Sequence, residues 1–303
     1  MEEIVLQYNS GSVYAKRDSA AKELLCAVSF EVSAGESLAL IGETGSGKTM
    51  IAQSILGVLP RNVYMQDGEI RFLSRPLPSG RRLRALLGRD IVYIPQSGHV
   101  YIDPSRTVRQ HMAGNLRRIG VSGAAQRAEM LRLLALSGFD APEDVLNKYP
   151  FQLSGGMAQR VTVALSLCSR ARLLIADEPT NGLDAGSKRQ TLSLLNALFP
   201  DAAKLIITHD ISVAAACGRI LVLCGGRMLE AGAADEVLSA PRHPYTKALL
   251  GALVENGMQE TPVLREETGL CPFYRRCPRA AERCRAEMTH KTAPGREWWC
   301  CAE

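Results

Sequence analysis

The sequence predicts an α/β protein with a parallel sheet at its centre, an antiparallel sheet near its start, an inserted helical region and a small cysteine-rich extension. Three patterns support this. Short apolar strands alternate with helices in the second half of the chain, which is typical of βαβ units. Residues 106–148 are rich in Arg and Leu at helical spacing, without a convincing strand. Five cysteines crowd the segment after residue 270.

Composition narrows the class of protein. The chain has 303 residues, 46% hydrophobic and 22% charged, so it can bury a core and forms two domains or one domain with an appendage. The net charge of +5 permits contacts with phosphates or a membrane surface without indicating nucleic acid. No apolar run approaches the roughly 18 residues that span a bilayer, and the start, Met-Glu-Glu, lacks the layout of a secretory signal. We therefore expect neither an integral membrane protein nor a secreted one.

The first hundred residues predict mainly strands. Alternating apolar side chains at Val28, Phe30 and Val32 favour an antiparallel sheet with one buried face. A helix is expected after Thr49, ending before Pro60. The predicted strands cover residues 4–8, 27–32, 37–41, 68–72 and 91–94.

The second half predicts helices that alternate with strands at residues 173–176, 204–208 and 220–224. A short helix follows Pro244, with Thr246 as its expected N-cap. The expected domains are residues 1–255, with a helical subdomain at about 97–158, and an extension at 256–303.

A glycine-rich loop lies between an apolar strand and a helix, the context that the pattern G-x-x-x-x-G-K-[ST] requires. Backbone N–H groups of such a loop wrap a phosphate, and the following helix points its positive end at it. Lys48 would reach the β- and γ-phosphates and Thr49 would hold Mg²⁺. The alternative is an ordinary glycine-rich turn, but the flanking strand and helix favour a nucleotide site. The predicted site comprises Gly42, Glu43, Thr44, Gly45, Ser46, Gly47, Lys48, Thr49 and Met50.

An acidic pair follows the apolar strand at residues 173–176. Asp177 and Glu178 would stand at the carboxyl edge of a parallel sheet, where ligands bind in such folds. Asp177 would organise Mg²⁺, and Glu178 would act as the general base toward water. Alone, such a pair is more often a solvated strand end, but its place after the glycine loop favours catalysis.

A second candidate anion site, Ser154, Gly155 and Gly156, precedes a helix. In isolation it would be a capped helix start. Beside a complete glycine loop, it indicates a group that serves the nucleotide of a neighbouring subunit.

These motifs, in this order, resemble those of the ATP-binding cassette (ABC) ATPases over about residues 1–255. The resemblance implies a P-loop ABC ATPase fold with a RecA-like parallel-sheet core, an antiparallel β subdomain and an inserted helical subdomain. It also implies that Ser154, Gly155 and Gly156 bind the γ-phosphate of ATP held by the partner subunit.

The resemblance assigns further roles. Gln96 would sense Mg²⁺ and the attacking water, Asp184 would communicate across the dimer, and His209 would contact the γ-phosphate. An aromatic ring near the N-terminus would stack on adenine; Tyr14 is preferred over Tyr8. The chain departs from the family pattern after Gln96, where residues 97–99 are Ser-Gly-His, and at Met157, where glutamine is usual.

Two segments, residues 149–157 and 241–250, resemble the ATPases of oligopeptide, dipeptide and nickel importers. In such importers a similar cysteine-rich tail resembles a [4Fe–4S] ligand set, which implies Cys271, Cys277, Cys284 and Cys301 as ligands, with Cys300 as the alternative to Cys301. Neighbouring arginines would lower the thiol pKa values. Zn²⁺ suits four cysteines equally, and idle thiols are a third possibility.

The implied function is that of an ATP-hydrolysing subunit, using ATP and Mg²⁺, of an importer for peptides or nickel. The resemblance implies a second, different ATPase subunit, two permease subunits and a substrate-binding protein as partners, with no nucleic acid. The chain would bind the cytoplasmic face of the inner membrane, with a permease coupling helix near Gln96. Alternatives are an exporter subunit or a non-transport ABC ATPase of DNA repair, the ribosome or phosphonate breakdown.

Overall fold

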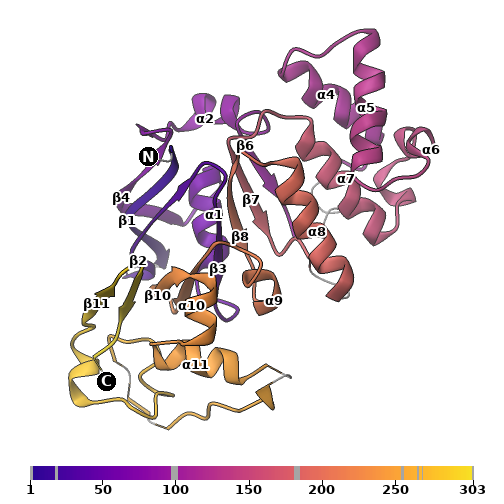
Figure 1. Cartoon of the computed structure of the whole chain (residues 1–303). Coiled ribbons are helices and arrows are strands. Elements are labelled where there is room, and N and C mark those ends of the chain that lie inside the picture. Colours follow the sequence, from indigo (N-terminus) through magenta and orange to yellow (C-terminus); the bar gives the residue numbers. More distant parts are fainter. Residues whose placement is uncertain are drawn as a thin grey trace.

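Two sheets and a helical lobe make up the molecule (Figure 1). The computed structural model describes residues 3–17, 20–96, 102–180, 185–253, 256–264, 266–267 and 269–301. Within these ranges, no helix combines the length and the apolar character that a membrane crossing requires.

The four-stranded sheet is antiparallel throughout, in the order β2-β1-β4-β5. Its strands are longer than the sequence predicts, because polar stretches that resemble turns continue the hairpin through several register shifts. The strands are β1 (Ile4–Arg17), β2 (Ala20–Ser33), β4 (Val63–Phe72) and β5 (Arg75–Pro76).

The central sheet has eight strands in the order β11-β12-β10-β9-β3-β8-β7-β6. Its neighbours from β9 to β6 are parallel, as predicted from the alternation of strands and helices. The strands are β3 (Ser37–Ile41), β6 (Ile91–Ile94), β7 (Leu173–Asp177), β8 (Ala203–Ile207), β9 (Arg219–Cys224), β10 (Arg227–Ala233), β11 (His290–Ala293) and β12 (Arg296–Trp299).

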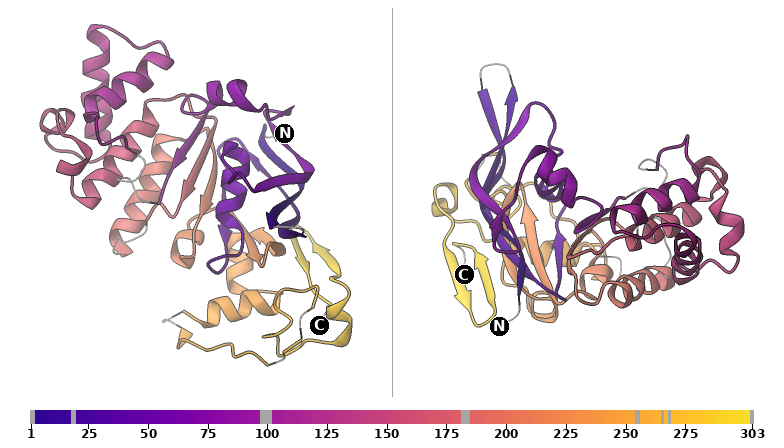
Figure 2. Two further views of the ribbon diagram at one scale, coloured as in Figure 1. Left: turned by 180° about the vertical axis from the view of Figure 1, so that it is seen from behind. Right: turned by 90° about the horizontal axis from the view of Figure 1, so that it is seen from above.

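Two features of this sheet differ from expectation. β3 lies in its middle, between β8 and β9, and not in the antiparallel sheet. The cysteine-rich extension contributes β11 and β12, and β12 pairs with β10 in the register Glu230 to Trp298. The extension therefore continues the central sheet (Figure 2).

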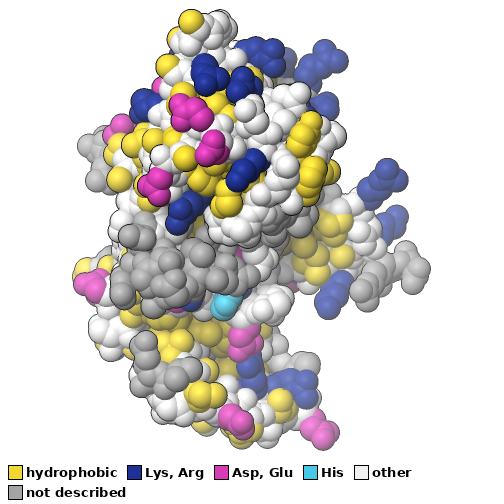
Figure 3. All heavy atoms as spheres, turned by 90° about the vertical axis from the view of Figure 1, so that its right-hand side faces the viewer, with side chains coloured by type: hydrophobic (Ala, Val, Ile, Leu, Met, Phe, Trp, Pro, Cys, Tyr) yellow, Lys and Arg dark blue, Asp and Glu magenta, His cyan; other side chains and the backbone are white. Residues whose placement is uncertain are grey.

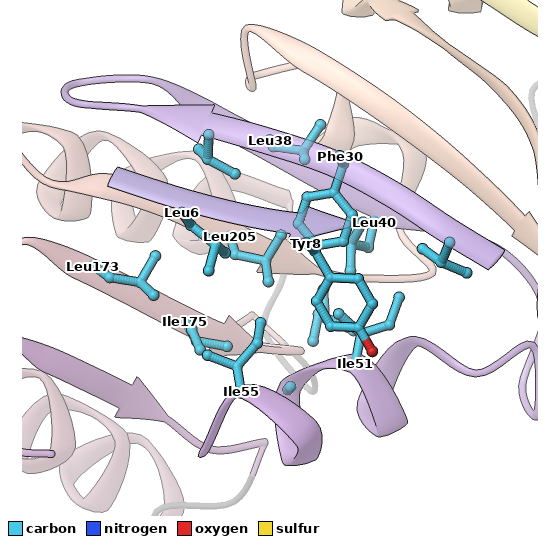
Figure 4. Packing of buried hydrophobic residues seen from close by; sticks show 14 of the residues in the cluster. Leu6, Tyr8, Phe30, Leu38, Leu40, Ile51, Ile55, Leu173, Ile175 and Leu205 are labelled. Atoms are coloured by element: carbon cyan, nitrogen blue, oxygen red, sulfur yellow. The ribbon is translucent and has the colours of Figure 1, made fainter. Parts of the chain in front are cut away.

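The helix α1 (Lys48–Leu56) packs between the two sheets. Tyr8 from β1, Ile51 from α1 and Leu40 from β3 are fully buried in this core (Figure 4). The packing fixes α1, and with it the loop before α1, against both sheets. A short helix α2 (Gly80–Leu86), which the sequence did not reveal, contributes Leu83 to the same core.

The opposite face of the central sheet is covered by α8 (Ala185–Leu198), α9 (Ile211–Ala214), α10 (Ala234–Ser239) and α11 (Pro244–Gly251). The N-cap of α11 is His243, whose Nδ1 accepts a 3.0 Å hydrogen bond from the N–H of Tyr245. The prediction of Thr246 as the cap was wrong, because Pro244 occupies the first helical position and Thr246 lies inside the helix.

The helical lobe has its own apolar core, formed by residues such as Met112, Leu116, Leu134 and Val161. It contains α4 (Val108–Arg118), α5 (Ala124–Leu136), α6 (Pro142–Leu146), the 3₁₀ turn Pro150–Gln152 and the start of α7 (Gly155–Leu167). The outer surface of the lobe mixes hydrophobic, basic and acidic side chains (Figure 3). α7 packs against both the lobe and the central sheet, so it joins the two parts.

The buried cap of α11 predicts a pH dependence of stability. Burial lowers the pKa of His243 from 6.5 to about 4, although Glu230 opposes the shift. Between these two pH values the unfolded chain binds more protons, so the free energy of unfolding should fall as pH drops, by up to about 1.4 kcal/mol per pH unit. His243→Asn keeps an acceptor for Tyr245 N–H but does not titrate. Urea unfolding across this range should show a shallower pH slope for the variant; equal slopes would contradict the prediction.

Candidate functional site

The glycine loop, residues 42–49, leaves the end of β3 and enters α1. Gly42 has a φ of 149°, and a Cβ there would lie 2.1 Å from the carbonyl oxygen of Leu223. Gly47 has a φ of 105°, and a Cβ there would meet Leu25 at 2.4 Å. Only glycine satisfies both positions, so β9 and β2 dictate the path of the loop.

Lys48 lies across the loop. Its Nζ donates to the carbonyl oxygens of Gly42 at 2.6 Å and Glu43 at 3.0 Å. Burial lowers its pKa, while Glu178, Asp177 and Glu43 act in the opposite direction. The ammonium group therefore stands beside the acidic strand end, where the phosphates of a nucleotide would complete its charge balance.

Asp177, at the end of β7, is buried beside Tyr93 and Thr49. The hydroxyl of Tyr93 donates to Asp177 Oδ2 at 3.2 Å. Burial raises the pKa of Asp177, and hydrogen bonds from Tyr93 and Thr49 oppose the rise. A carboxylate beside a threonine hydroxyl has the donor chemistry that Mg²⁺ prefers, so these residues suit the predicted ion. Tyr93 was not predicted; it lies on β6, which pairs with β7 in the register Tyr93 to Ile175.

Glu178 contacts the residues that follow β8. Its Oε1 lies 2.7 Å from Nδ1 of His209 and accepts from the N–H of His209 at 3.1 Å, and Oε2 accepts from Thr208 Oγ1 at 3.2 Å. The backbone of Glu178 is left-handed, with a φ of 49°. Such a conformation at a functional position is consistent with a carboxylate that the surrounding structure holds in a required direction.

These groups open into one cavity of about 370 Å³. It brings together the glycine loop, Gln96, Asp177, Glu178 and His209, as the sequence predicts for a catalytic site. Its lining is Leu24, Thr44, Gly45, Gly47, Lys48, Thr49, Met50, Gln96, Asp177, Glu178, Ile207 and His209.

Ser154, Gly155 and Gly156 are exposed at the start of α7 and do not line this cavity. Ser154 caps the helix by accepting from the N–H of Met157 at 3.3 Å. Gln159, one turn along α7, donates to the carbonyl of Pro179 at 3.0 Å, which ties the helix to the segment after Glu178. Asp184 and residues 97–99 lie outside the described residues.

Neither tyrosine proposed for adenine lines the cavity. Tyr8 is fully buried, stacks on Phe30 and is hydrogen-bonded to Ser54, so it is a core residue. Tyr14 stacks on Tyr64 and donates to Glu23 at 3.0 Å. Leu24, which was not predicted as a site residue, lines the cavity beside the glycine loop.

The five cysteines of the extension line a second, enclosed cavity of about 10 Å³. Among the described residues, no three His, Cys, Asp or Glu side chains are arranged to hold a metal ion. Burial raises the pKa of Cys271 to about 12, and Cys224, Cys277 and Cys300 add to the rise. The expectation that arginines lower the thiol pKa values was therefore wrong for Cys271, because burial dominates there.

A glycine loop at a strand–helix junction, opposite an Asp-Glu strand end, defines a P-loop nucleotide-hydrolysing protein. Residues 25–181 match the protein family described as ABC transporter, and residues 229–284 match the oligopeptide/dipeptide transporter, C-terminal region. The chain belongs to the ABC transporter family and is the ATP-hydrolysing subunit of a transporter.

Individual relatives agree with this family assignment. The chain is 38% identical to the dipeptide transport ATP-binding protein DppD of Bacillus subtilis (strain 168), across 83% of this chain and 80% of that protein. It is 34% identical to DppD of Escherichia coli (strain K12), across 98% of this chain and 96% of that protein. Its fold resembles the dimeric ATP-binding cassette MJ0796 bound to ADP and Pi, with a TM-score of 0.67 at 23% identity over 76% of this chain and 98% of that one. The predicted family and fold are confirmed, and the non-transport alternative finds no support.

The lining of the nucleotide cavity predicts how ATP binding responds to substitutions near the N-terminus. Leu24→Ala should raise the Kd for ATP about threefold to tenfold, since it removes apolar contact area beside the loop. Tyr14→Ala should change the Kd less than about twofold, because Tyr14 is engaged outside the cavity. Fluorescence titration with an ATP analogue measures both. A larger effect at Tyr14 than at Leu24 would identify Tyr14 as the adenine contact.

Proposed function

We propose that this chain is the ATP-hydrolysing subunit of an importer for dipeptides or oligopeptides. The supporting observation is that an ABC cassette and an oligopeptide/dipeptide transporter C-terminal region occur in one chain. The two DppD relatives are described as dipeptide transport proteins. Peptides are therefore a better-supported cargo than nickel, and the chain would bind the cytoplasmic face of the membrane through the permease.

The residues around the cavity suit ATP hydrolysis. The glycine loop and Lys48 would bind the phosphates, and Thr49, Asp177 and Gln96 would hold Mg²⁺, which balances phosphate charge when it is bound. Glu178 would accept a proton from the attacking water. His209, in contact with Glu178 at 2.7 Å, would orient this carboxylate and reach the γ-phosphate.

The exposed start of α7 supports a dimeric site. Ser154, Gly155 and Gly156 present backbone N–H groups at a helix N-terminus to solvent, and a Cβ on either glycine would meet nothing within 4 Å. This open face would complete the site of a second ATPase subunit, with Asp184 at the same interface. We propose a different chain as that partner.

The permease would dock between the lobe and the sheets. A cavity of about 390 Å³ there is lined by residues that include Leu56, Tyr93, Pro95 and Leu165, close to Gln96. An apolar groove of this kind suits a short helix from the permease. Closure of the dimer on ATP would then move the lobe and the permease together.

Glu178→Gln tests the role of the carboxylate as base. The amide keeps the size of the side chain but cannot accept a proton, so hydrolysis in the assembled transporter should fall at least about a hundredfold. The Kd for ATP should remain within about twofold of wild type, and the ATP-bound dimer should accumulate. Phosphate release and size-exclusion chromatography measure these outcomes.

Glu143→Gln, an exposed glutamate in the helical lobe, is the matched control and should retain full activity. Normal turnover by a correctly folded Glu178→Gln protein would show that another group is the base.

We further propose that the cysteine-rich extension holds a [4Fe–4S] cluster through Cys271, Cys277, Cys284 and Cys301. All five thiols line one cavity, which supports this donor set, and this cavity of about 10 Å³ must widen when a cluster binds. Zn²⁺ binds the same four-thiolate set, so the metal content of the protein distinguishes the two. Cys300 stays an alternative to Cys301, because both residues line the cavity. Cys301 Sγ contacts the carbonyl of Glu287 at 3.2 Å.

Iron, sulfide and zinc content of an anaerobic preparation tests this proposal. About four irons per chain are expected, with loss of iron and of the visible absorption in Cys277→Ser. Cys300→Ser and Cys301→Ser form a matched pair that identifies the fourth ligand, and Cys26→Ser is the control. Stoichiometric zinc, or neither metal, would contradict the cluster.

A further inference from the structure

The extension reaches back to the glycine loop through an ion pair. Arg276 donates from Nη1 and Nη2 to Oε1 and Oε2 of Glu43, both at 2.8 Å. This bidentate arrangement uses the planar fork of the guanidinium group, which gives direction as well as attraction. Glu43 is the second residue of the loop, so the pair joins positions 233 residues apart.

A second contact reaches the same residue. The N–H of Glu43 donates to the hydroxyl of Tyr245 at 2.9 Å. Tyr245, on α11, is buried and packs edge-on against Phe273 with ring centroids 5.4 Å apart. The guanidinium group of Arg276 lies 5.2 Å from the centroid of the same Phe273 ring. We name Tyr245, Phe273 and Arg276 the loop clasp.

Two residues of the loop clasp belong to the cysteine-rich segment. Phe273 and Arg276 lie on the turn between Cys271 and Cys277, where the N–H of Cys277 donates to the carbonyl of Phe273 at 2.9 Å. Pro272, on the same turn, packs so closely on Gly225 that a Cβ there would lie 2.7 Å from it. Thiols of one cavity therefore flank the residues that hold the loop.

Glu43 is held through its carboxylate, its N–H and its carbonyl. Its carboxylate binds Arg276, its N–H binds Tyr245, and its carbonyl accepts from Lys48 Nζ at 3.0 Å. The carbonyl of Glu43 also accepts from the N–H of Ser46 at 3.1 Å, so Glu43 fixes the course of the loop that would surround a phosphate.

We propose that Arg276, on the cysteine-rich extension, and Tyr245, on α11, are positioning residues for ATP binding that together preorganise the glycine loop. The inference rests on the proposed function, since it assumes that ATP binds this loop. The clasp touches the loop and not the reacting atoms. It should therefore govern nucleotide affinity and leave the rate of hydrolysis at saturating ATP unchanged.

The alternative is an ordinary surface ion pair. The side chains of Arg276 and Glu43 are 26% and 45% exposed, and pairs of this kind contribute little to global stability. Loss of Arg276 should therefore leave the Tm nearly unchanged. A change in nucleotide affinity without a change in Tm separates a positioning role from a structural one.

The test uses Arg276→Gln and Tyr245→Phe in the complete subunit. The Kd for ATP and for ADP should rise about threefold to tenfold in each, with kcat in the assembled transporter within about twofold. Arg276→Lys should recover only part of the affinity, since an ammonium group cannot bind bidentately. Arg279→Gln, an exposed arginine on the same segment, is the matched control.

A double-mutant cycle gives the direct measure of coupling. Glu43→Gln combined with Arg276→Gln should weaken binding no more than either change alone. Unchanged affinity in both Arg276→Gln and Tyr245→Phe, or additive effects in the cycle, would overturn the proposal. If Arg276→Gln fails to fold, Tyr245→Phe decides the question. A wild-type chain that binds no ATP would instead refute the proposed function.

Discussion

The conformation of the glycine loop where it leaves β3 is the constraint on which the site depends. Gly42 passes so close to the carbonyl of Leu223 that no side chain is tolerated there. β3 lies between β8 and β9 in the middle of a buried sheet, so the loop emerges at a fixed point. The neighbouring strands β7 and β8 then bring Asp177, Glu178 and His209 to the same edge, as expected at the carboxyl ends of parallel strands.

The C-terminal extension also contacts the glycine loop. Its strands β11 and β12 continue the central sheet, and Arg276 forms an ion pair with Glu43. Arg276 precedes Cys277, which lines the thiol cavity, so the ion pair links this cavity to the glycine loop.

Local patterns carried most of the prediction. The glycine loop and the Asp-Glu strand end are each a continuous run of residues, so their patterns, together with the flanking strands and helix, indicated the site. The long β1–β2 hairpin was missed because its polar middle resembles turns and is held by pairing across strands. The choice between Tyr8 and Tyr14 depended on which face of β1 is buried. Leu24 lines the cavity where the pairing of β1 with β2 shifts by one residue, and periodicity in the sequence does not predict such a shift. The Arg276–Glu43 contact joins distant segments, so only the fold could show it.

Hydrogen exchange at residues 42–47 tests the anchoring of the loop most directly. Backbone amides held by tertiary contacts exchange slowly, and loss of one anchor speeds the exchange locally. Without nucleotide, Arg276→Gln should exchange this segment faster than wild type, while the strands of the central sheet remain equally protected. Identical exchange of the segment in the two proteins would show that the loop holds its conformation without the extension, and would contradict the account.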